Sequence, residues 1–256
     1  MKVTVIGSGN VAEALVKGCL KASIQLSQIC SRNELRGKFL ASIAKTKWFN
    51  KAIEASDVYL VAVKDSAIEE AILQANIPLD SVIAHTAGAV SIEAIPDKYK
   101  NRAVFYPFQT FTKGIDVDFE TIPIFCEATN QKTLETITTL AGLLSKAVYE
   151  AGLDTRCRIH LSGVFVNNFV NHMYSISRKI LQKQDLPFAT LFPLMKETLR
   201  KAMANEDPDD VQTGPAVRGD LGTISRHLEL LEDDENMCNI YKSITQNICK
   251  RTLKKD

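Results

Sequence analysis

The sequence predicts an α/β protein in which a doubly wound, mostly parallel sheet is followed by an all-α domain. Through residue 152, short β-rich runs alternate with helical patterns, and such alternation builds a parallel sheet with helices on its faces. The run "VYLVAV" at 58–63 is apolar throughout, as is typical of a strand buried on both faces. From residue 153 onward the β-rich runs disappear. We therefore expect one domain over residues 1–152 and a helical domain over 153–256.

The first domain contains short runs rich in β-branched and aromatic residues, which predict strands. In chain order they cover residues 2–7, 26–33, 47–50, 57–65, 81–88, 102–111, 122–128 and 146–151. Helical spacing of apolar residues predicts helices between them, over residues 10–20, 34–45, 67–75 and 131–146. Ser66 and Glu69 have the spacing of a capping box at the start of the third helix.

The second domain has only helical patterns. They predict helices over residues 155–183, 187–205, 223–231 and 237–253. Pro193 lies inside the second of these, so we expect a kink or break there. Asp207 and Pro208 are expected to cap and open a further helical turn.

Composition and charge argue against several classes of partner. The chain has 256 residues, of which 45% are hydrophobic and 24% charged, as is typical of globular proteins. A formal net charge of +1 gives no overall field that would favour nucleic acid or an anionic membrane. The apolar run at 58–63 is far too short to span a bilayer, and a strand starting at Lys2 leaves no room for a signal peptide. The six cysteines lack the spacing of a metal site, so we expect free thiols, no metal and a cytoplasmic protein.

The segment after the first strand has the pattern of a phosphate-binding turn. It lies between a strand and a helix, which is the context that this pattern needs. Gly7 permits the tight turn, Gly9 lets the backbone approach a pyrophosphate, and Ala12 packs the helix against the sheet. The first N–H groups of the helix would then bind the phosphates. The alternative is a strand–helix turn that binds nothing. The predicted Rossmann-type dinucleotide site begins with Gly7, Ser8, Gly9, Asn10, Val11 and Ala12.

The end of the second strand favours NADP over NAD as the cofactor. Sites for NAD carry an Asp or Glu about 20 residues after the glycines, whereas this chain has Ser31, Arg32 and Asn33 there. Arg32 can pair with a 2′-phosphate, although an exposed arginine in a loop is the alternative. The carboxyl ends of the next strands would add further cofactor contacts, from Val63, Lys64, His85 and Thr86.

Motifs spread over most of the chain carry a resemblance to known oxidoreductases. They read "GSGNVA", "HTAGA" (85–89), "YPFQTF" (106–111), "HLSGVFVNNF" (160–169) and "TGPAVRGD" (213–220). With them the chain resembles the superfamily of 6-phosphogluconate dehydrogenase, β-hydroxyacid dehydrogenases, ketopantoate reductase and pyrroline-5-carboxylate reductase. More narrowly, it resembles a bacterial family assigned as NADP-dependent oxidoreductases, whose helical second domain has no assigned function. The resemblance implies NADP binding in the first domain, a substrate pocket between the domains and a homodimer formed through the helical domain.

The chain departs from the better-understood relatives at one position. In β-hydroxyacid dehydrogenases a catalytic lysine precedes an asparagine by one helical turn. Here Val164 and Phe165 stand one turn before the asparagines at 167 and 168, which argues against alcohol oxidation by the lysine mechanism.

Other residues are the candidates for chemistry. His160 is the expected general acid, because imidazole exchanges protons near neutral pH. Asn168, two helical turns later, would orient a substrate carbonyl or the nicotinamide amide. Arg218, in the loop 213–220, would bind a substrate carboxylate. The alternatives are a surface histidine, an interhelical hydrogen bond and a surface pair between Arg218 and Asp220. Gln109 and Thr110 could line the cleft, while His172 and His227 are expected to be structural.

The predicted function is hydride transfer between NADP(H) and a small keto or hydroxy acid. One alternative is an imine reductase of the pyrroline-5-carboxylate reductase type, because a protonated imine needs positioning more than proton donation. The other is a non-catalytic NADP(H)-binding sensor. The expected partners are a small-molecule substrate and a second copy of the chain.

Overall fold

The chain divides into two compact units, Met1–Asn168 (unit 1) and Phe169–Asp256 (unit 2), in a computed structural model that describes residues 1–50 and 55–252. Every strand in the described residues lies in unit 1, and unit 2 is helical there, so the predicted fold class is confirmed. The domain boundary predicted from the sequence, after residue 152, coincides with the start of a helix at Leu153 and stays a prediction. No helix in the described part of the chain is long and apolar enough to cross a membrane.

Unit 1 is built on one sheet with strand order β3-β2-β1-β4-β5-β6-β7-β8. The strands are β1 Lys2–Ile6, β2 Gln25–Cys30, β3 Lys47–Phe49, β4 Val58–Val61, β5 Val82–His85, β6 Arg102–Pro107, β7 Ile124–Ala128 and β8 Val148–Glu150. Neighbouring strands are parallel, apart from the antiparallel pair β6 and β7. The order reverses between β1 and β4, where Ile6 lies opposite Val61. In doubly wound sheets the ligand crevice lies beyond the carboxyl ends of the strands at this point.

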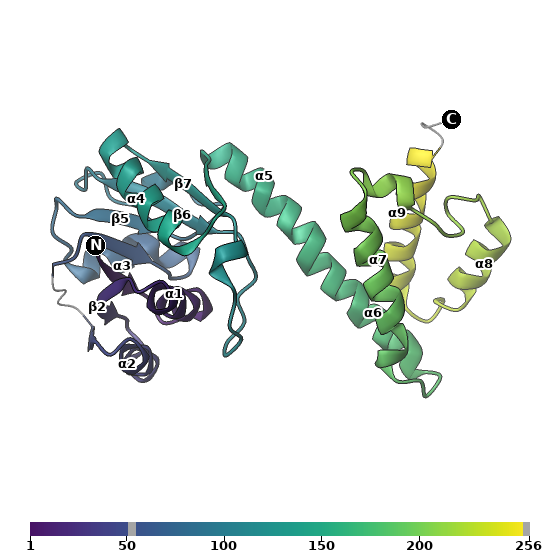
Figure 1. The fold of residues 1–256 in the computed structure, drawn as a ribbon. Helices are drawn as coiled ribbons and strands as arrows, with labels where there is room; N and C mark the ends of the chain where they lie inside the picture. Colours follow the sequence, from purple (N-terminus) through teal and green to yellow (C-terminus); the bar gives the residue numbers. More distant parts are fainter. Residues whose placement is uncertain (51–54, 253–256) are drawn as a thin grey trace. The chain divides into compact units, whose positions relative to one another are not determined.

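Helices cover both faces of the sheet, as a doubly wound fold requires (Figure 1). Side chains along β4 alternate between two cores: Val58 and Leu60 belong to one, Tyr59 and Val61 to the other. The first core contains residues of α1 Asn10–Lys21, α2 Glu34–Ile43 and α4 Gln131–Leu144. The second contains residues of α3 Ile68–Ala75.

The start of α3 corrects the predicted capping box. A 3₁₀ turn, Asp65–Ala67, precedes the helix, so α3 begins at Ile68 with Ala67 at its N-cap and no side-chain cap. The tighter turn moves the helix start past Ser66, and a spacing rule written for an α-helix cannot detect that shift.

The long helical pattern at 155–183 is not one regular α-helix. Helix α5 Leu153–Gly163 is followed by a π-helical segment, Val164–Phe169, and then by α6 Val170–Gln182. Single π turns inside α-helices are rare and are often found at functional sites. The apolar spacing that we used to predict the helix persists through such a turn, so the sequence pattern does not reveal it.

The remaining helices lie in unit 2. Helix α7 Phe192–Ala204 follows a 3₁₀ turn, Phe188–Leu191, and the break predicted at Pro193 is confirmed because this proline lies in the first turn of α7. Asp207 caps a short 3₁₀ turn, Pro208–Val211, as predicted. Helices α8 Leu221–Glu229 and α9 Glu235–Thr252 follow, and the predicted end of the last helix at residue 253 lies outside the described residues.

Candidate active site

The turn after β1 requires a glycine at position 7 for reasons internal to the protein. The backbone of Gly7 has φ 129°, in a region that side chains disfavour, and its N–H donates to the Cys30 carbonyl at 2.7 Å. A Cβ atom at position 7 would lie 2.1 Å from the carbonyl oxygen of Ala62. The first glycine of the motif therefore lets β1 turn tightly between β2 and β4, as predicted.

The backbone at Gly9 does not require a glycine in the way that the backbone at Gly7 does. It is the N-cap of α1 with an ordinary φ of −79°, and a Cβ atom there would meet nothing within 4 Å. No side chain caps α1 in the described structure, so the first N–H groups of the helix are left for solvent or a ligand. Open space beside uncapped helical N–H groups fits a pyrophosphate. Ala12 is fully buried in the core, as predicted.

A cavity of about 380 Å³, here called the β2 cavity, lies beside the end of β2. Ser31 and Asn33 line it, but both side chains also shape the turn. The Ser31 hydroxyl donates to the Asn33 carbonyl at 3.0 Å and accepts from the indole N–H of Trp48 at 3.2 Å. The Asn33 amide oxygen caps α2 by accepting from the backbone N–H of Arg36. Among the described residues that line this cavity, Arg32, between them, is the cationic group.

Arg32 lies beside a carboxylate that the sequence did not indicate. Its side chain is 70% exposed, and its Nη1 atom is 3.5 Å from Oε1 of Glu70 on α3. The same Glu70 oxygen accepts a hydrogen bond from Gln74 at 2.7 Å. Because both partners are exposed, the pair adds little to stability and leaves the guanidinium available to another anion.

A larger cavity of about 720 Å³, here called the β6 cavity, also lies within unit 1. It is lined by the phosphate turn, the end of β4, the segment after β6, and α5 with the π segment. Its titratable lining residues are Lys64, Tyr106 and His160, and its amides include Asn167 and Asn168. Both asparagines line the cavity although they are consecutive in sequence, and both lie in the π segment.

Three of the sequence motifs quoted above, "GSGNVA", "YPFQTF" and "HLSGVFVNNF", contribute residues to the wall of the β6 cavity. A Cβ atom at Gly88 of "HTAGA" would lie 2.4 Å from the ring of Tyr106, so that glycine makes room for the tyrosine. In the same way, a Cβ atom at Gly163 would lie 2.6 Å from the ring of Phe108. The Tyr106 hydroxyl is 3.0 Å from Nδ1 of His160. "YPFQTF" and "HLSGVFVNNF" therefore line one cavity, and "HTAGA" packs against it.

The structure brings most of the predicted site residues to these cavities. Gly9, Asn10, Val11, Lys64, His160 and Asn168 line the β6 cavity, as do Gln109 and Thr110. Gly7, Ser31, Arg32 and Asn33 line the β2 cavity, while Ser8 and Val63 line both. Neither His85 nor Thr86 is among the residues that line them. Arg218 is exposed and lies in unit 2, and its role stays a prediction.

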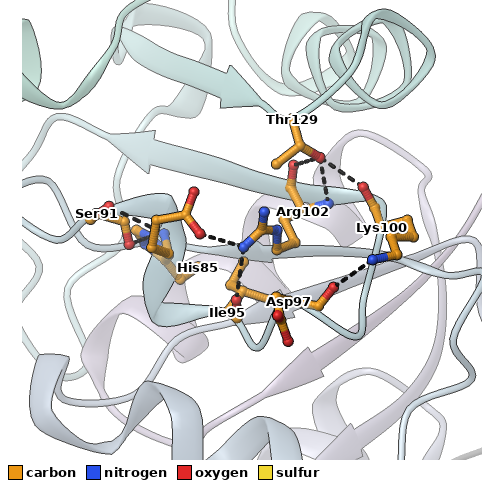
Figure 2. Close-up of polar contacts among 8 residues, drawn as sticks. His85, Ser91, Ile95, Asp97, Lys100, Arg102 and Thr129 are labelled. Carbon is orange, nitrogen blue, oxygen red and sulfur yellow. Dashed lines mark hydrogen bonds and ion pairs between the residues drawn. The ribbon is translucent and has the colours of Figure 1, made fainter.

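His85 is held inside the protein by its own loop. Its side chain is fully buried, and its Nδ1 accepts from the backbone N–H of Ala87 at 3.3 Å. Its Nε2 lies 3.2 Å from the Ser91 carbonyl (Figure 2). An accepting Nδ1 places the proton on Nε2, which donates to Ser91. The pKa of His85 is lowered to about 4, mainly by burial and to a smaller extent by the charge of Arg156, while the hydrogen bond to the Ser91 carbonyl acts in the opposite direction. The imidazole is therefore neutral and ties the loop after β5 together.

Arg102, at the start of β6, forms hydrogen bonds with the loop that connects β5 to β6. Its guanidinium donates to the Ile95 carbonyl and to Glu93, and its backbone N–H donates to the hydroxyl of Thr129 (Figure 2). These bonds hold the loop between β5 and β6, which leads into the strand that carries Tyr106.

Arg156 anchors α5 to the sheet. Its side chain is fully buried, forms an ion pair with Glu127 of β7, and donates to the carbonyls of Val90 at 2.8 Å and Ala151 at 3.0 Å. A buried guanidinium needs such partners, because an unpaired buried charge is costly. Arg156 lies one helical turn before His160, so this network fixes the part of α5 that carries the histidine.

Sequence reasoning missed the roles of Tyr106, Phe108, Glu70 and Arg156. The motif "YPFQTF" begins at the end of β6 and was a usable signal for the first two, because strand ends face the ligand crevice. Nothing local distinguishes Glu70 or Arg156 from other charged helical residues. Within residues 1–50 and 55–252, no cluster of His, Cys, Asp and Glu could hold a metal ion. In unit 2, His227 has a partner, the hydroxyl of Tyr241 at 2.9 Å.

Comparisons with known families match both parts of the chain. Residues 2–88 match the family described as NADP oxidoreductase, coenzyme F420-dependent, and residues 122–248 match a domain of unknown function, DUF2520. A comparison with curated protein sequences found no match.

Solved structures similar to this chain cover nearly its whole length. A Bacteroides fragilis protein assigned as an NADP oxidoreductase is 34% identical, covers 97% of this chain and 98% of its own, and has a TM-score of 0.89. A Thermotoga maritima protein is 22% identical, and the match covers 98% of this chain and 99% of that protein with a TM-score of 0.81. An imine reductase from Myxococcus stipitatus, in complex with NADP⁺, is 14% identical, and the match covers 99% of this chain and 93% of that protein with a TM-score of 0.64. The last two similarities show a shared fold and nothing more.

Proposed function

We propose a function from the premise that the chain belongs to the family of NADP oxidoreductases in which a dinucleotide-binding domain precedes a DUF2520 domain. The proposed reaction is hydride transfer between NADP(H) and a small keto or hydroxy acid. The observation that carries the proposal is the position of the Tyr106–His160 pair. It lies in a cavity that also contains the phosphate turn, and Ser8 and Val63 join that cavity to the β2 cavity.

The residues present fit NADP(H). The N–H groups at the start of α1 and the open space beside Gly9 would hold the pyrophosphate. Arg32, which lines the β2 cavity, would pair with the 2′-phosphate. When bound, NADPH supplies the hydride for the reduction of a carbonyl.

The side chains of the β6 cavity supply the remaining chemistry. His160 donates a proton to the substrate oxygen during reduction and accepts it during oxidation, which replaces the lysine of the related dehydrogenases. The amides of Asn167 and Asn168 orient the substrate carbonyl. Phe108 and Val164 give the cavity an apolar wall, which strengthens polar contacts within it by excluding water.

The charge of the β6 cavity favours a keto acid over an iminium substrate. Lys64 is a cationic group in its lining, and no carboxylate is among the described residues that line it. A positively charged imine would have no carboxylate to stabilise it there, whereas Lys64 attracts a substrate carboxylate. A further contact of that carboxylate with Arg218 remains part of the proposal.

We also propose that two copies associate through unit 2. In its described residues, Ala216 is the one buried side chain, whereas large apolar residues are exposed along α7. A helical domain is stabilised by burying apolar faces, so these helices need another surface. The resemblance to dimeric relatives makes a second copy of this chain the occupant.

A pair of glycine variants tests cofactor binding. A Cβ atom has room at Gly9 and also at Gly142 in α4, so both alanine variants should fold. We expect Gly9→Ala to weaken NADPH binding about tenfold or more, because its methyl group occupies the space of the pyrophosphate, and Gly142→Ala to bind as the wild type. Fluorescence titration of Trp48, the only tryptophan, measures this from its position beside Ser31. Equal affinity of both variants would contradict the site.

Turnover assays separate the proposed reaction from its alternatives. NADPH consumption should be seen with members of a panel of small 2-oxo acids and should fall about 10²-fold or more in His160→Ala. Turnover of cyclic imines alone would favour the imine reductase. Tight NADPH binding without turnover of either panel would favour the sensor.

A further inference from the structure

We infer that Tyr106 is a positioning residue for His160: its hydroxyl holds Nδ1, and Nε2 is left as the nitrogen that exchanges a proton with the substrate. The inference rests on the proposed function, in which His160 is the acid and base. It adds a residue and a specific hydrogen bond that determine how the histidine works.

The tyrosine is well placed to hold another side chain still. It lies on β6, is 9% exposed, and its ring packs against Gly88. Phe108 contacts it edge-on, with ring centroids 6.1 Å apart. The hydroxyl thus projects from a rigid strand to a histidine on a different element, α5, which Arg156 anchors one turn earlier.

A tyrosine hydroxyl can serve both protonation states of the histidine. When the imidazole is neutral, Nδ1–H donates to the hydroxyl oxygen, and this bond keeps the ring proton on Nδ1 and leaves the lone pair of Nε2 free. When the ring is an imidazolium, Nδ1–H makes the same hydrogen bond and Nε2 carries the second proton. Burial raises the pKa of Tyr106 to about 12, so the phenol keeps its own proton throughout.

The proton balance of the step follows from this arrangement. In reduction, the Nε2–H bond of the imidazolium breaks, the proton forms an O–H bond with the substrate oxygen, and the electron pair remains on Nε2. The Nδ1–H bond to the Tyr106 hydroxyl oxygen stays in place throughout. In oxidation Nε2 takes the proton from the substrate O–H, and Tyr106 ends each direction as a neutral phenol.

Tyr106 faces His160 from β6, and Lys64 lines the same cavity after β4. The charged and titratable neighbours on α5 itself are Asp154, Arg156, Cys157 and Arg158, of which Asp154 and Arg158 form an ion pair with each other. Arg156 is occupied by Glu127 and by backbone carbonyls. A change in the behaviour of His160 on loss of the Tyr106 hydroxyl is therefore assigned to that hydroxyl.

Nitrogen NMR of the full-length protein tests the hydrogen bond without needing a substrate. Long-range ¹H–¹⁵N spectra report the tautomer and the Nδ1 shift of each histidine, and His160→Gln identifies the signals of His160. We expect the neutral ring of wild-type His160, observed at alkaline pH, to show a hydrogen-bonded, protonated Nδ1 and an unprotonated Nε2. Tyr106→Phe should lose this preference for the Nδ1–H tautomer. An identical Nδ1 signal in both proteins, or an unprotonated Nδ1 in the neutral wild-type ring, would overturn the inference.

Kinetics then test the consequence for catalysis. Tyr106→Phe keeps the packed ring, so KM for substrate should change little while kcat falls about tenfold, less than the effect of removing His160 itself. Its pH profile of kcat should change as well. The control is Tyr149→Phe on β8, where the half-exposed ring stacks on Phe125 outside the cavity, and its kinetics should match the wild type. An unchanged kcat and pH profile in Tyr106→Phe would refute the positioning role.

Failure of this inference can be told apart from failure of the proposed function. If no substrate is turned over but the NMR result holds, the proposed reaction falls while the Tyr106–His160 bond stands. If keto acids are reduced and His160→Ala is inactive, but Tyr106→Phe matches the wild type in spectrum and kinetics, the reaction stands and the inference falls.

Discussion

Unit 1 and unit 2 differ in how they bury their apolar residues. Unit 1 contains two large cores, one on each face of its sheet, and a smaller cluster of Ile92, Val104 and Tyr106. Almost every strand residue of β1, β4 and β6 is buried. Unit 2 has Ala216 as the one buried side chain in its described residues, and Leu199 of α7 is 60% exposed. The same chain thus joins a domain with its own core to helices whose apolar faces are still uncovered.

The difference explains why the described site lies in unit 1. A site needs side chains held in place by packing, and both the β2 and β6 cavities are lined by residues up to Asn168 only. The predicted substrate pocket between the domains, and the part of Arg218 in it, stay predictions. Three measurements test how differently the two units are packed.

The largest effect is expected where unit 1 packs backbone against backbone. Gly7→Ala would place a methyl group 2.1 Å from the Ala62 carbonyl oxygen at a φ of 129°, and a carbonyl between two strands cannot move aside. We expect a loss of about 4 kcal/mol in the free energy of unfolding, from overpacking and backbone strain together. Urea unfolding measures it, with Gly142→Ala as the control. A loss below about 1 kcal/mol would show that the turn is more adaptable than its packing suggests.

The second effect is a pH dependence that belongs to the interior of unit 1. His85 has its pKa lowered from 6.5 to about 4, so the unfolded chain binds a proton below pH 6.5 that the folded protein refuses until about pH 4. Stability is therefore retained above pH 6.5 and falls as the pH drops through this window, by about 3 kcal/mol.

Urea unfolding at several pH values measures this slope. His85→Gln should flatten it between pH 6.5 and 4, whatever the variant's stability at neutral pH. The control, His172→Gln, changes an exposed histidine of α6 and should keep the wild-type slope. Equal slopes in all three proteins would mean that His85 is not the buried group responsible.

In unit 2 we expect the smallest change in the free energy of unfolding, together with a clear loss of dimer stability. Leu199→Glu replaces an exposed leucine of α7, so the single chain should lose less than about 0.5 kcal/mol. If α7 is covered by a second copy, the buried charge should weaken the dimer about tenfold or more. Light scattering over a dilution series measures the mass, with the exposed Lys196→Glu as the charge-changing control. A wild-type protein that is monomeric throughout would contradict the proposed dimer.

The sequence alone was sufficient for features with a local physical cause. Gly7 could be predicted because a tight turn after a strand needs a residue without a side chain. The position of Arg32 at the end of β2, where it lines the β2 cavity, could be predicted as well, while its contact with a cofactor stays a prediction. The parallel sheet followed from the apolar run of β4 and from the alternation of strands with helices. Local rules failed at two places. At Ser66 a tighter 3₁₀ turn delays the start of the helix, and at 164–169 a wider π-helical segment interrupts it. Neither change can be read from the spacing of residues in the sequence.

Only the tertiary structure could decide the pairings that make the site. Tyr106 and His160 are 54 residues apart, and Arg32 and Glu70 are 38 apart, so nothing in their neighbouring residues indicates the contact. Gly88 makes room for the tyrosine only because β5 and β6 are neighbours in the sheet. The sequence by itself determined that a dinucleotide fold forms and which residues turn its first loop. Packing between distant elements decided which nitrogen of His160 is held, because that depends on a hydroxyl from another strand.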